Sequence, residues 1–478
     1  MDRPSKLPGL IFGPVLFLVL MLFVQPPAVF SNEGWTVIAL TVWMMTWWIT
    51  EALPLPVTAL LPIIFLPSFE VMPLKDVTMG YGHPVVFLFV GGFVIAQAME
   101  KYQLHKRAAL SILKFTGDHA NGIIFGFMLS SALMSMWMPN TAAAVLMLPI
   151  GLAICEVIFN DSQRYDDRKK THFKITIMLS IAFGANIGGM ATLIGTPTNA
   201  ILAAFVSDQF GISITFWKWL MVGFPFAALL LLSGWAVLTH LVYPNKMGHI
   251  ENAQPLIQKE IDALGSIKHE EKITAFIFLT TISLWIFKGL LPFQIHDASI
   301  AIFGAVLCFS LPAKNGLLLN TRDLPKIPWA ILFLFGGGLA LANAIQNTGL
   351  SDLIAQGLST QDNIEIIGFI IMTVMVILLM TEFIGNVPVI TVMLPVLTGV
   401  AIAFELNPLT IIVPATLAAS CAFMLPTATP PNAVVFSSGH LRVVHMIKAG
   451  VLMNALAIIL LSILALFWFP QILGINLR

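Results

Sequence analysis

Apolar runs of about 20 residues recur along the whole chain of 478 residues, and they constrain the fold more than any other feature. A run of that length is what an α-helix needs to cross the hydrocarbon core of a bilayer. Only 10% of the residues are charged, against about 25% in soluble proteins, so the chain cannot cover a water-facing surface. Its 24 basic and 24 acidic side chains cancel, which argues against nucleic-acid binding. The sequence therefore predicts an all-α polytopic membrane protein embedded in a lipid bilayer.

Basic residues orient the predicted helices, because they concentrate on the cytoplasmic side of membrane proteins. Arg3 and Lys6 place the N-terminus inside, ahead of a first span within residues 1–32. All later basic clusters can face the cytoplasm if the chain makes roughly eleven crossings and two apolar segments return to the side they entered from. The C-terminus is then outside. We expect a multi-pass protein of the cell membrane, plasma or inner.

The two returning segments fit re-entrant hairpins. Residues 121–159 have basic clusters at both ends and a Pro-Asn-Thr break in the middle, so this hairpin opens to the cytoplasm. An ordinary pair of spans joined by a tight turn is the alternative. Residues 366–404 lie in a stretch without Lys or Arg, between Lys326 and Arg442, so this hairpin opens to the outside. Hairpins that enter from opposite faces are typical of an inverted repeat.

Self-comparison supports an internal repeat. FLFVGGFVIAQAM from Phe87 matches FLFGGGLALANAI from Phe333, and the same offset relates Asn140 to Asn386. The matches predict a first repeat at residues 33–244 and a second at 273–478, each with its hairpin. The charged stretch at 245–272 is interpreted as a solvated cytoplasmic connector.

A second pair of related motifs, GTPTNA from Gly195 and ATPPNA from Ala428, places a Thr-Pro step inside an apolar span. Proline breaks a helix, and irregular backbone at membrane depth is tolerated only where protein or a water-filled cavity satisfies it. Two discontinuous helices are therefore predicted. Their free carbonyls could hold a cation, and their new N-termini could attract an anion. A simple proline kink is the alternative, which the pairing of each break with an Asn-containing hairpin disfavours.

Asn140, Thr141 and Asn386 are the side chains expected at the centre of the site. A carboxamide can donate to an anion and lend its oxygen to a cation at the same time. An isolated Asn in a membrane segment more often joins two helices, but the repeat favours a site here. Glu382, four residues before Asn386, is interpreted as a brace for the hairpin, with proton coupling as the alternative.

At these motifs the sequence resembles the divalent anion/sodium symporter family, which includes sodium–dicarboxylate and sodium–sulfate carriers. The matching stretches are TEALPLPVTALLP from Thr50, MWMPNTAAAVLMLPI from Met136, GGMATLIGTPTNA from Gly188, IPWAILFLFGGGLALA from Ile327, TEFIGN from Thr381 and FMLPTATPPNAVVF from Phe423. The resemblance implies two inverted repeats of five spans after an initial helix. It also implies a homodimer and an elevator-type movement of the hairpin-bearing part against a scaffold.

The resemblance further implies two sodium sites and one anion site. The first sodium site would involve Ser135, Pro139, Asn140 and Gly195, and the second Thr381, Ile384, Asn386 and Ala428. The anion would lie among Asn140, Thr141, Thr196, Pro197, Asn386, Val387, Thr429 and Pro430. Bound sodium would supply the positive charge that no Lys or Arg supplies, and no organic cofactor is expected.

Both hairpin tips depart from the Ser-Asn-Thr that is usual in the family. Pro139 has neither an N–H nor a hydroxyl to donate, Gly385 lacks the serine hydroxyl, and Val387 lacks the hydroxyl that would meet one end of a dicarboxylate. A buried hydrogen-bonding group left unpaired costs about 1–3 kcal/mol, enough to change substrate preference.

We expect a secondary active transporter, not an enzyme, that carries di- or tricarboxylates such as succinate by sodium-coupled symport. The alternative is an anion exchanger, or a carrier of sulfate, sulfonate or monocarboxylate with altered sodium coupling. A receptor or enzyme built on the same scaffold would need a soluble domain or a cluster of acids, bases or metal ligands, and no such cluster is found in the sequence.

Overall fold

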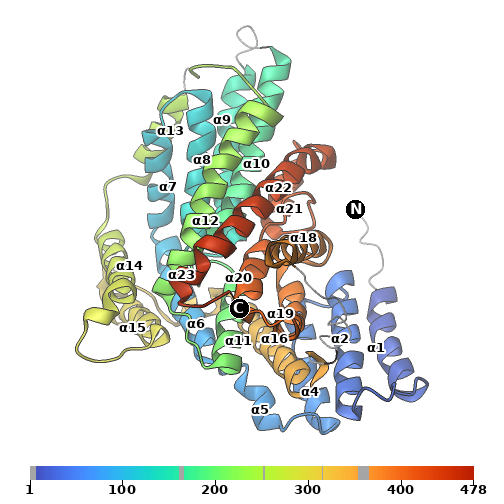
Figure 1. Ribbon diagram of the computed structural model, residues 1–478. Coiled ribbons are helices and arrows are strands. Elements are labelled where there is room, and N and C mark those ends of the chain that lie inside the picture. The colour runs from blue at the N-terminus through green and yellow to red at the C-terminus, as the bar shows by residue number, and fades with distance from the viewer. Residues whose placement is uncertain are drawn as a thin grey trace.

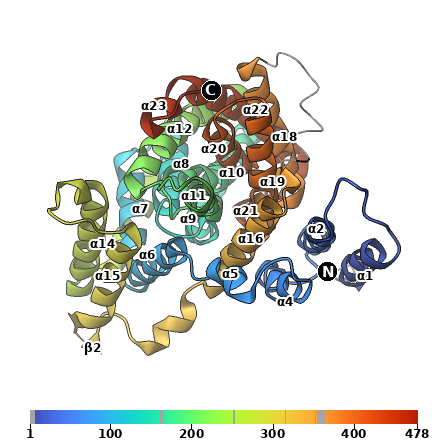
Figure 2. The same cartoon turned by 60° about the horizontal axis from the view of Figure 1, so that its bottom comes forward.

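The computed structural model describes residues 7–160, 166–250, 253–314, 316–351, 353 and 365–477. Within these ranges the fold is helical apart from one short antiparallel pair, β1 (Pro312–Ala313) with β2 (Gly316–Leu317). Figures 1 and 2 show a central bundle with α1 (Leu7–Leu22) and α2 (Asn32–Thr50) at one edge. The pair α14 (His269–Phe287) and α15 (Asp297–Ser310) lies at the opposite edge.

The remaining helices of the first half follow in chain order. They are α3 (Leu55–Thr58), α4 (Leu61–Ser68), α5 (Leu74–Met79), α6 (Pro84–Lys101), α7 (Leu104–Phe115), α8 (Ala120–Ser135), α9 (Asn140–Asn160), α10 (Asp167–Ala191), α11 (Pro197–Phe210), α12 (Phe216–Ala236) and the π-helical turn η1 (Val237–Val242). A central place for α10 follows from its burial, which is nearly complete from Phe173 to Ala191.

The second half adds α13 (Ala253–Leu264) ahead of α14. After α14 come the 3₁₀ turns η2 (Lys288–Leu290) and, beyond α15, η3 (Thr321–Lys326), then α16 (Trp329–Asn347), α18 (Ile366–Ile384), α19 (Asn386–Ala403), α20 (Pro408–Ala419), α21 (Pro430–Ser437), α22 (Val443–Phe467) and α23 (Phe469–Leu473). Several helices begin where a side chain caps the first turn. The Ser31 hydroxyl accepts from the backbone N–H of Gly34 at 3.0 Å, and Asn407 accepts from that of Leu409 at 3.1 Å.

Both predicted interruptions are present. The first separates α10 from α11 over residues 192–196, and the second separates α20 from α21 over residues 420–429. Pro197 and Pro430 are the first residues of the new helices, where a missing N–H leaves no hydrogen bond unmade. The prolines therefore start helices here and do not merely kink them.

The long helices α12 and α22 run antiparallel. The Tyr243 hydroxyl, just past α12 and η1, donates to the carbonyl of His445 at the start of α22 at 2.9 Å. The Trp468 indole N–H, at the end of α22, donates to the carbonyl of Met221 near the start of α12 at 2.8 Å. These two contacts define the two ends of the bundle.

The hairpins α8–α9 and α18–α19 enter from those opposite ends. Ala120, the first residue of α8, donates its N–H to the carbonyl of Gly248 at 2.8 Å, beyond the end of α12. Asn407, which closely follows α19, donates its N–H to the carbonyl of Leu477 at 3.2 Å, beyond the end of α22. Since the two long helices are antiparallel, the bases of the hairpins lie at opposite ends of the bundle.

Eight helical stretches of the described residues are long and apolar enough to cross a membrane. Six shorter apolar helices accompany them, α1 among these. The fold is thus that of an all-helical polytopic membrane protein. Helix length does not separate spans from hairpin limbs, because both limbs of α18–α19 are among the eight, so the count of eleven spans stays a prediction.

The connector at residues 245–272 contains a helix that its charges do not indicate. This is the amphipathic helix α13, whose residues Ala253 and Ile257 are buried where α13 packs against α7. The Lys106 amine of α7 lies 2.9 Å from a carboxylate oxygen of Glu260 on α13. The apolar residues of AQPLIQKEIDAL recur at helical spacing, a pattern that the surrounding charges obscure.

Candidate functional site

The first hairpin tip is organised by Ser135, at the end of α8, and Asn140, at the start of α9. The Ser135 hydroxyl donates to Asn140 Oδ1 at 2.5 Å. Between them, Pro139 accepts at its carbonyl from the backbone N–H groups of Ala142 at 2.9 Å and Ala143 at 3.3 Å. Pro139 thus starts α9 through its carbonyl, the one hydrogen-bonding group that proline keeps.

This tip lies directly against the first helix break. A Cβ atom built on Gly189 of α10 would sit 2.5 Å from Asn140 Oδ1, and one built on Gly195 would meet the carbonyl of Gly189. Only glycine permits so close an approach of backbone to side chain. The structure therefore brings Ser135, Asn140 and Gly195 together around Gly189, as the sequence predicts for the first sodium site.

The second tip repeats the arrangement at equivalent positions. The Thr381 hydroxyl lies 2.9 Å from Asn386 Oδ1 and 2.7 Å from the carbonyl of Ala419, the last residue of α20. Ile384 is apolar and can offer a cation only its backbone carbonyl. In both halves the hydroxyl residue and the asparagine are five positions apart in the sequence. Each of these pairs lies beside a helix break.

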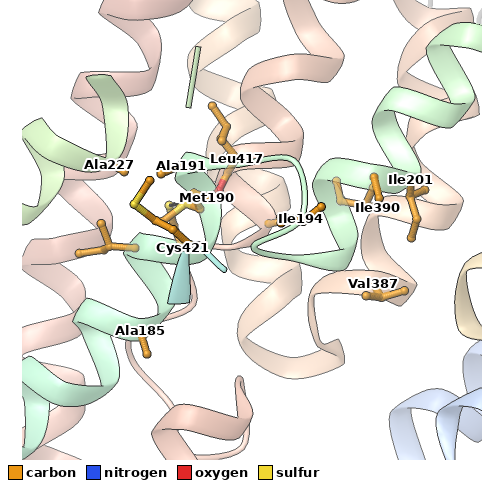
Figure 3. Packing of buried hydrophobic residues seen from close by; sticks show 14 of the residues in the cluster. Ala185, Met190, Ala191, Ile194, Ile201, Ala227, Val387, Ile390, Leu417 and Cys421 are labelled. Carbon is orange, nitrogen blue, oxygen red and sulfur yellow. Dashed lines mark hydrogen bonds between the residues drawn. The ribbon is translucent and has the colours of Figure 1, made fainter. Parts of the chain in front are cut away.

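The predicted anion-site residues lie at these tips and at the starts of α11 and α21. Asn140, Thr141, Pro197 and Asn386 are half-buried, Pro430 is exposed, and Thr196, Val387 and Thr429 are buried. Figure 3 shows Val387 and Ile390 in the first turns of α19 together with Ile194 of the first break, and α11 packs against α19. Asn140 and Asn386 thus keep part of their surface exposed in an otherwise buried region.

The two helix breaks also contact each other. The hydroxyls of Thr198 and Ser420 lie 3.1 Å apart. The sulfur atoms of Cys421 and Met190 lie 3.7 Å apart, and Figure 3 shows the two side chains next to each other. Residues from the two halves of the chain therefore form one continuous centre.

Two asparagines with no role in the sequence prediction hold the broken ends. Asn199 Nδ2 donates to the carbonyl of Thr192 at 2.8 Å and to that of Gly189 at 3.2 Å. Asn432 Nδ2 donates to the carbonyls of Leu425 and Ala422, both at 3.0 Å, with the same spacings along the chain. The available signal was the Asn that GTPTNA and ATPPNA share.

Glu382 braces the second break. Its carboxylate is fully buried and accepts from the backbone N–H groups of Phe423, Met424 and Leu425 and from Asn454 Nδ2, at 2.9–3.1 Å. All of these contacts are donors, and none of them could take up a proton from the carboxyl group. The geometry agrees with the interpretation of Glu382 as a brace.

Cation binding at this centre would rely mainly on neutral oxygen atoms. The described residues contain no group of three or more His, Cys, Asp or Glu side chains able to hold a metal ion. Hydroxyl, carboxamide and backbone carbonyl oxygens suit a hard monovalent cation, and the two tips and breaks present these groups.

A family profile described as the sodium:sulfate symporter transmembrane region matches residues 8–475, nearly the whole chain. The chain belongs to the sodium:sulfate symporter family. This membership confirms the resemblance seen in the motifs and makes the protein a multi-pass membrane transporter.

Curated relatives in this family match over almost their full lengths. The sodium-dependent dicarboxylate transporter SdcS of Staphylococcus saprophyticus subsp. saprophyticus is 37% identical over 484 residues, covering 99% of this chain and 93% of the relative. SdcS of Staphylococcus aureus strain USA300 is also 37% identical, over 486 residues with the same coverage.

Two solved transporters share the overall fold of this chain at much lower identity. The YdaH transporter of Alcanivorax borkumensis superposes with a TM-score of 0.59 at 12% identity, covering 92% of this chain and 99% of its own. MtrF of Neisseria gonorrhoeae gives a TM-score of 0.55 at 12% identity, with 98% and 95% covered. These likenesses concern the fold alone.

Proposed function

We propose that this protein is a sodium-dependent dicarboxylate symporter of the cell membrane. One observation carries the proposal: two equivalent hairpin tips, each with a hydroxyl–carboxamide pair, meet two helix breaks at one centre. The dicarboxylate is supported by the 37% identity, over nearly the full chain, to relatives named sodium-dependent dicarboxylate transporters.

One sodium ion binds at each tip in this proposal. The first is held by the oxygens of Ser135 and Asn140 and by carbonyls near Pro139 and Gly195. The second is held by Thr381 and Asn386 and by carbonyls near Ile384 and Ala428. The buried Glu382 carboxylate follows Thr381 directly in the chain, and its negative charge favours a cation on that side.

The anion binds between the two sodium ions. The carboxamides of Asn140 and Asn386 donate to it, the hydroxyls of Thr141, Thr196 and Thr429 are within its reach, and Pro197 and Pro430 start the helices whose N-termini face it. Val387 limits the hydrogen bonds available at the second tip. Sodium binds first, because it orders the tips and offsets the charge of the incoming dicarboxylate.

Transport follows an elevator-type alternating-access cycle in a homodimer. In this proposal the chain forms two inverted repeats of five spans after an initial helix, with residues 33–244 and 273–478 as the repeats. The opposite entry of the two hairpins supports this arrangement. The N-terminus is cytoplasmic and the C-terminus outside, as the positive residues indicate.

Uptake into proteoliposomes tests the function. An inward sodium gradient should drive accumulation of labelled succinate above its equilibrium level, whereas choline or potassium in place of sodium should not. Equal uptake in the three salts, or uptake that requires an anion inside the vesicle, would instead favour an exchanger that has lost sodium coupling at the Pro139 tip.

A further inference from the structure

We propose that Asn186 is a positioning residue that makes the Thr429 hydroxyl a hydrogen-bond donor to one carboxylate of the substrate. The inference deepens the proposed function and rests on it. Asn186 lies on α10 and is 1% exposed, and its side chain reaches the start of α21 in the other half of the chain. It belongs to none of the motifs by which the sequence predicts the site.

The chain of bonds starts at the second helix break. Between α20 and α21 the carbonyls of Ala422 and Leu425 lie outside any helix, and both accept from Asn432 Nδ2 at 3.0 Å. Two carbonyls on one side of the Asn432 carboxamide fix its orientation, because only the nitrogen can donate. Asn432 Oδ1 must therefore face the other way and needs a donor.

Asn186 supplies that donor. Asn186 Nδ2 lies 3.1 Å from Asn432 Oδ1 and 3.0 Å from Thr429 Oγ1. A carboxamide nitrogen has two hydrogens, and here each has an acceptor. Asn186 Oδ1 is buried and has no partner within the described part of the chain, so this side chain acts through its nitrogen. The carbonyls of the break therefore fix the carboxamide of Asn432, Asn432 fixes that of Asn186, and Asn186 donates to Thr429.

The Thr429 hydroxyl can act toward a ligand only as a hydrogen-bond donor. Its oxygen accepts from Asn186 Nδ2 and, as the cap of α21, from the backbone N–H of Asn432 at 3.4 Å. Those two bonds occupy both lone pairs. No acceptor for the Thr429 hydrogen occurs among the residues that the structure describes, so the hydrogen is available to a ligand. A hydroxyl in this state can donate to a carboxylate but cannot coordinate a cation.

The first helix break does not repeat this arrangement of hydrogen bonds. Thr196, the equivalent of Thr429, has a hydroxyl neighbour, Thr198, at 3.4 Å, and either could donate. Asn199, the equivalent of Asn432, has an Oδ1 atom with no partner in the described ranges. The polarised hydroxyl therefore lies in the half whose hairpin tip carries Val387 in place of a hydroxyl residue. In space, however, α21 packs against α9 and α10 of the first half, whereas α19, which carries Val387, packs against α11.

Kinetics of sodium-driven succinate uptake test the inference. Asn186→Leu removes the donor, and the freed Thr429 hydroxyl can then turn away from the ligand, so KM for succinate should rise by about tenfold. Thr429→Val should raise KM by a similar factor, and Thr429→Ser should stay near wild type. The double variant Asn186→Leu/Thr429→Val should be no worse than Thr429→Val alone, because both changes remove the same hydrogen bond.

A merely structural role for Asn186 predicts a different pattern. The two losses would then multiply in the double variant, and kcat and the sodium concentration for half-maximal uptake would change as well. Either result, or an unchanged KM in Asn186→Leu, would overturn the proposal. Should Asn186→Leu fail to fold, Asn186→Ala gives the same test, because it removes the same donor and KM should rise by a similar factor. A wild-type protein that takes up no succinate would contradict the proposed function instead.

Discussion

At the scale of single residues, asparagine performs three different tasks around the centre. Asn140 and Asn386 accept from a hydroxyl across their hairpin tips. Asn199 and Asn432 donate to carbonyls released by the helix breaks. Asn186 joins the two halves through its nitrogen. A carboxamide suits all three tasks because it is neutral and offers both donors and an acceptor in a region where an unpaired charge would be expensive.

The asymmetry between Thr141 and Val387 gives a residue-scale prediction. Val387→Thr adds a hydroxyl at the second tip, where the equivalent position of the first half already has one. One added hydrogen bond to a carboxylate is worth about 1.4 kcal/mol or somewhat more, so KM for succinate should fall by about tenfold. Kinetics of sodium-driven uptake measure this, with Val389→Thr, a fully buried valine on the same helix, as the matched control. An unchanged KM would mean that the carboxylate does not reach residue 387.

A second residue-scale prediction concerns Asp323, in η3 outside the membrane. Burial alone would raise its pKa, but hydrogen bonds from Lys101 at 2.8 Å and Lys326 at 3.0 Å outweigh burial and lower the pKa from 3.8 to about 2. Since the folded-state pKa is the lower one, the ionised carboxylate stabilises the fold above about pH 4, and this contribution is lost as the pH falls toward 2.

Asp323→Ala should therefore lower the free energy of unfolding by about 1–3 kcal/mol at pH 7. Thermal unfolding of the detergent-solubilised protein should show the same difference from wild type at pH 5 and a smaller one at pH 3. Asp76→Ala, at an exposed position on α5, is the control and should change little. A difference that grows on acidification would contradict the assigned ion pairs.

At the scale of elements, the two hairpin tips reach the same hydrogen bond through different backbones. Pro139 starts α9 with its fixed φ, whereas Gly385 links α18 to α19 at φ 87° and ψ 157°, a conformation that side chains rarely adopt. Each replaces the serine expected in the family. The second tip therefore depends on glycine for its shape, and the first does not.

Gly385→Ala should destabilise the protein by about 1–3 kcal/mol, because any Cβ is strained at this φ even though no atom lies within 4 Å of it. Gly368→Ala is the matched control, since Gly368 lies exposed in α18 with ordinary helical backbone and open space around it. That variant should be neutral or slightly more stable. Equal thermal midpoints for the two variants would show that the tip tolerates a side chain.

The elements also show which features could be predicted from sequence and which could not. The helix breaks and tip contacts follow from local signals, namely proline and motifs that recur in both halves. Asn186 carried no such signal, because its partner Thr429 lies 243 positions away and meets it only when α10 packs against α21. The helix α13 was obscured by its charges. Pairings set by tertiary packing are the part that a single sequence does not reveal.

At the scale of the whole molecule, aromatic and polar contacts connect the hairpin-bearing bundle to the peripheral pair α14–α15. Phe216 of α12 stacks on Trp285 of α14 with ring centroids 4.4 Å apart, and Trp137 of the first tip meets Phe278 of α14 at 4.9 Å. Asp297 of α15 accepts from the backbone N–H of Phe216 at 2.7 Å. In the proposed elevator cycle these contacts would break each time the bundle moves.

The central claim, that sodium at two hairpin tips creates one dicarboxylate site, is tested most directly by ligand-induced thermal stabilisation. A ligand at 100 times its Kd stabilises the folded state by about 2.7 kcal/mol. Succinate should therefore raise the unfolding midpoint of the wild type in sodium but not in potassium or choline. Asn140→Ala and Asn386→Ala should each lose the shift, while the exposed Asn347→Ala keeps it. A succinate shift of equal size without sodium, or one that survives in both tip variants, would contradict the account.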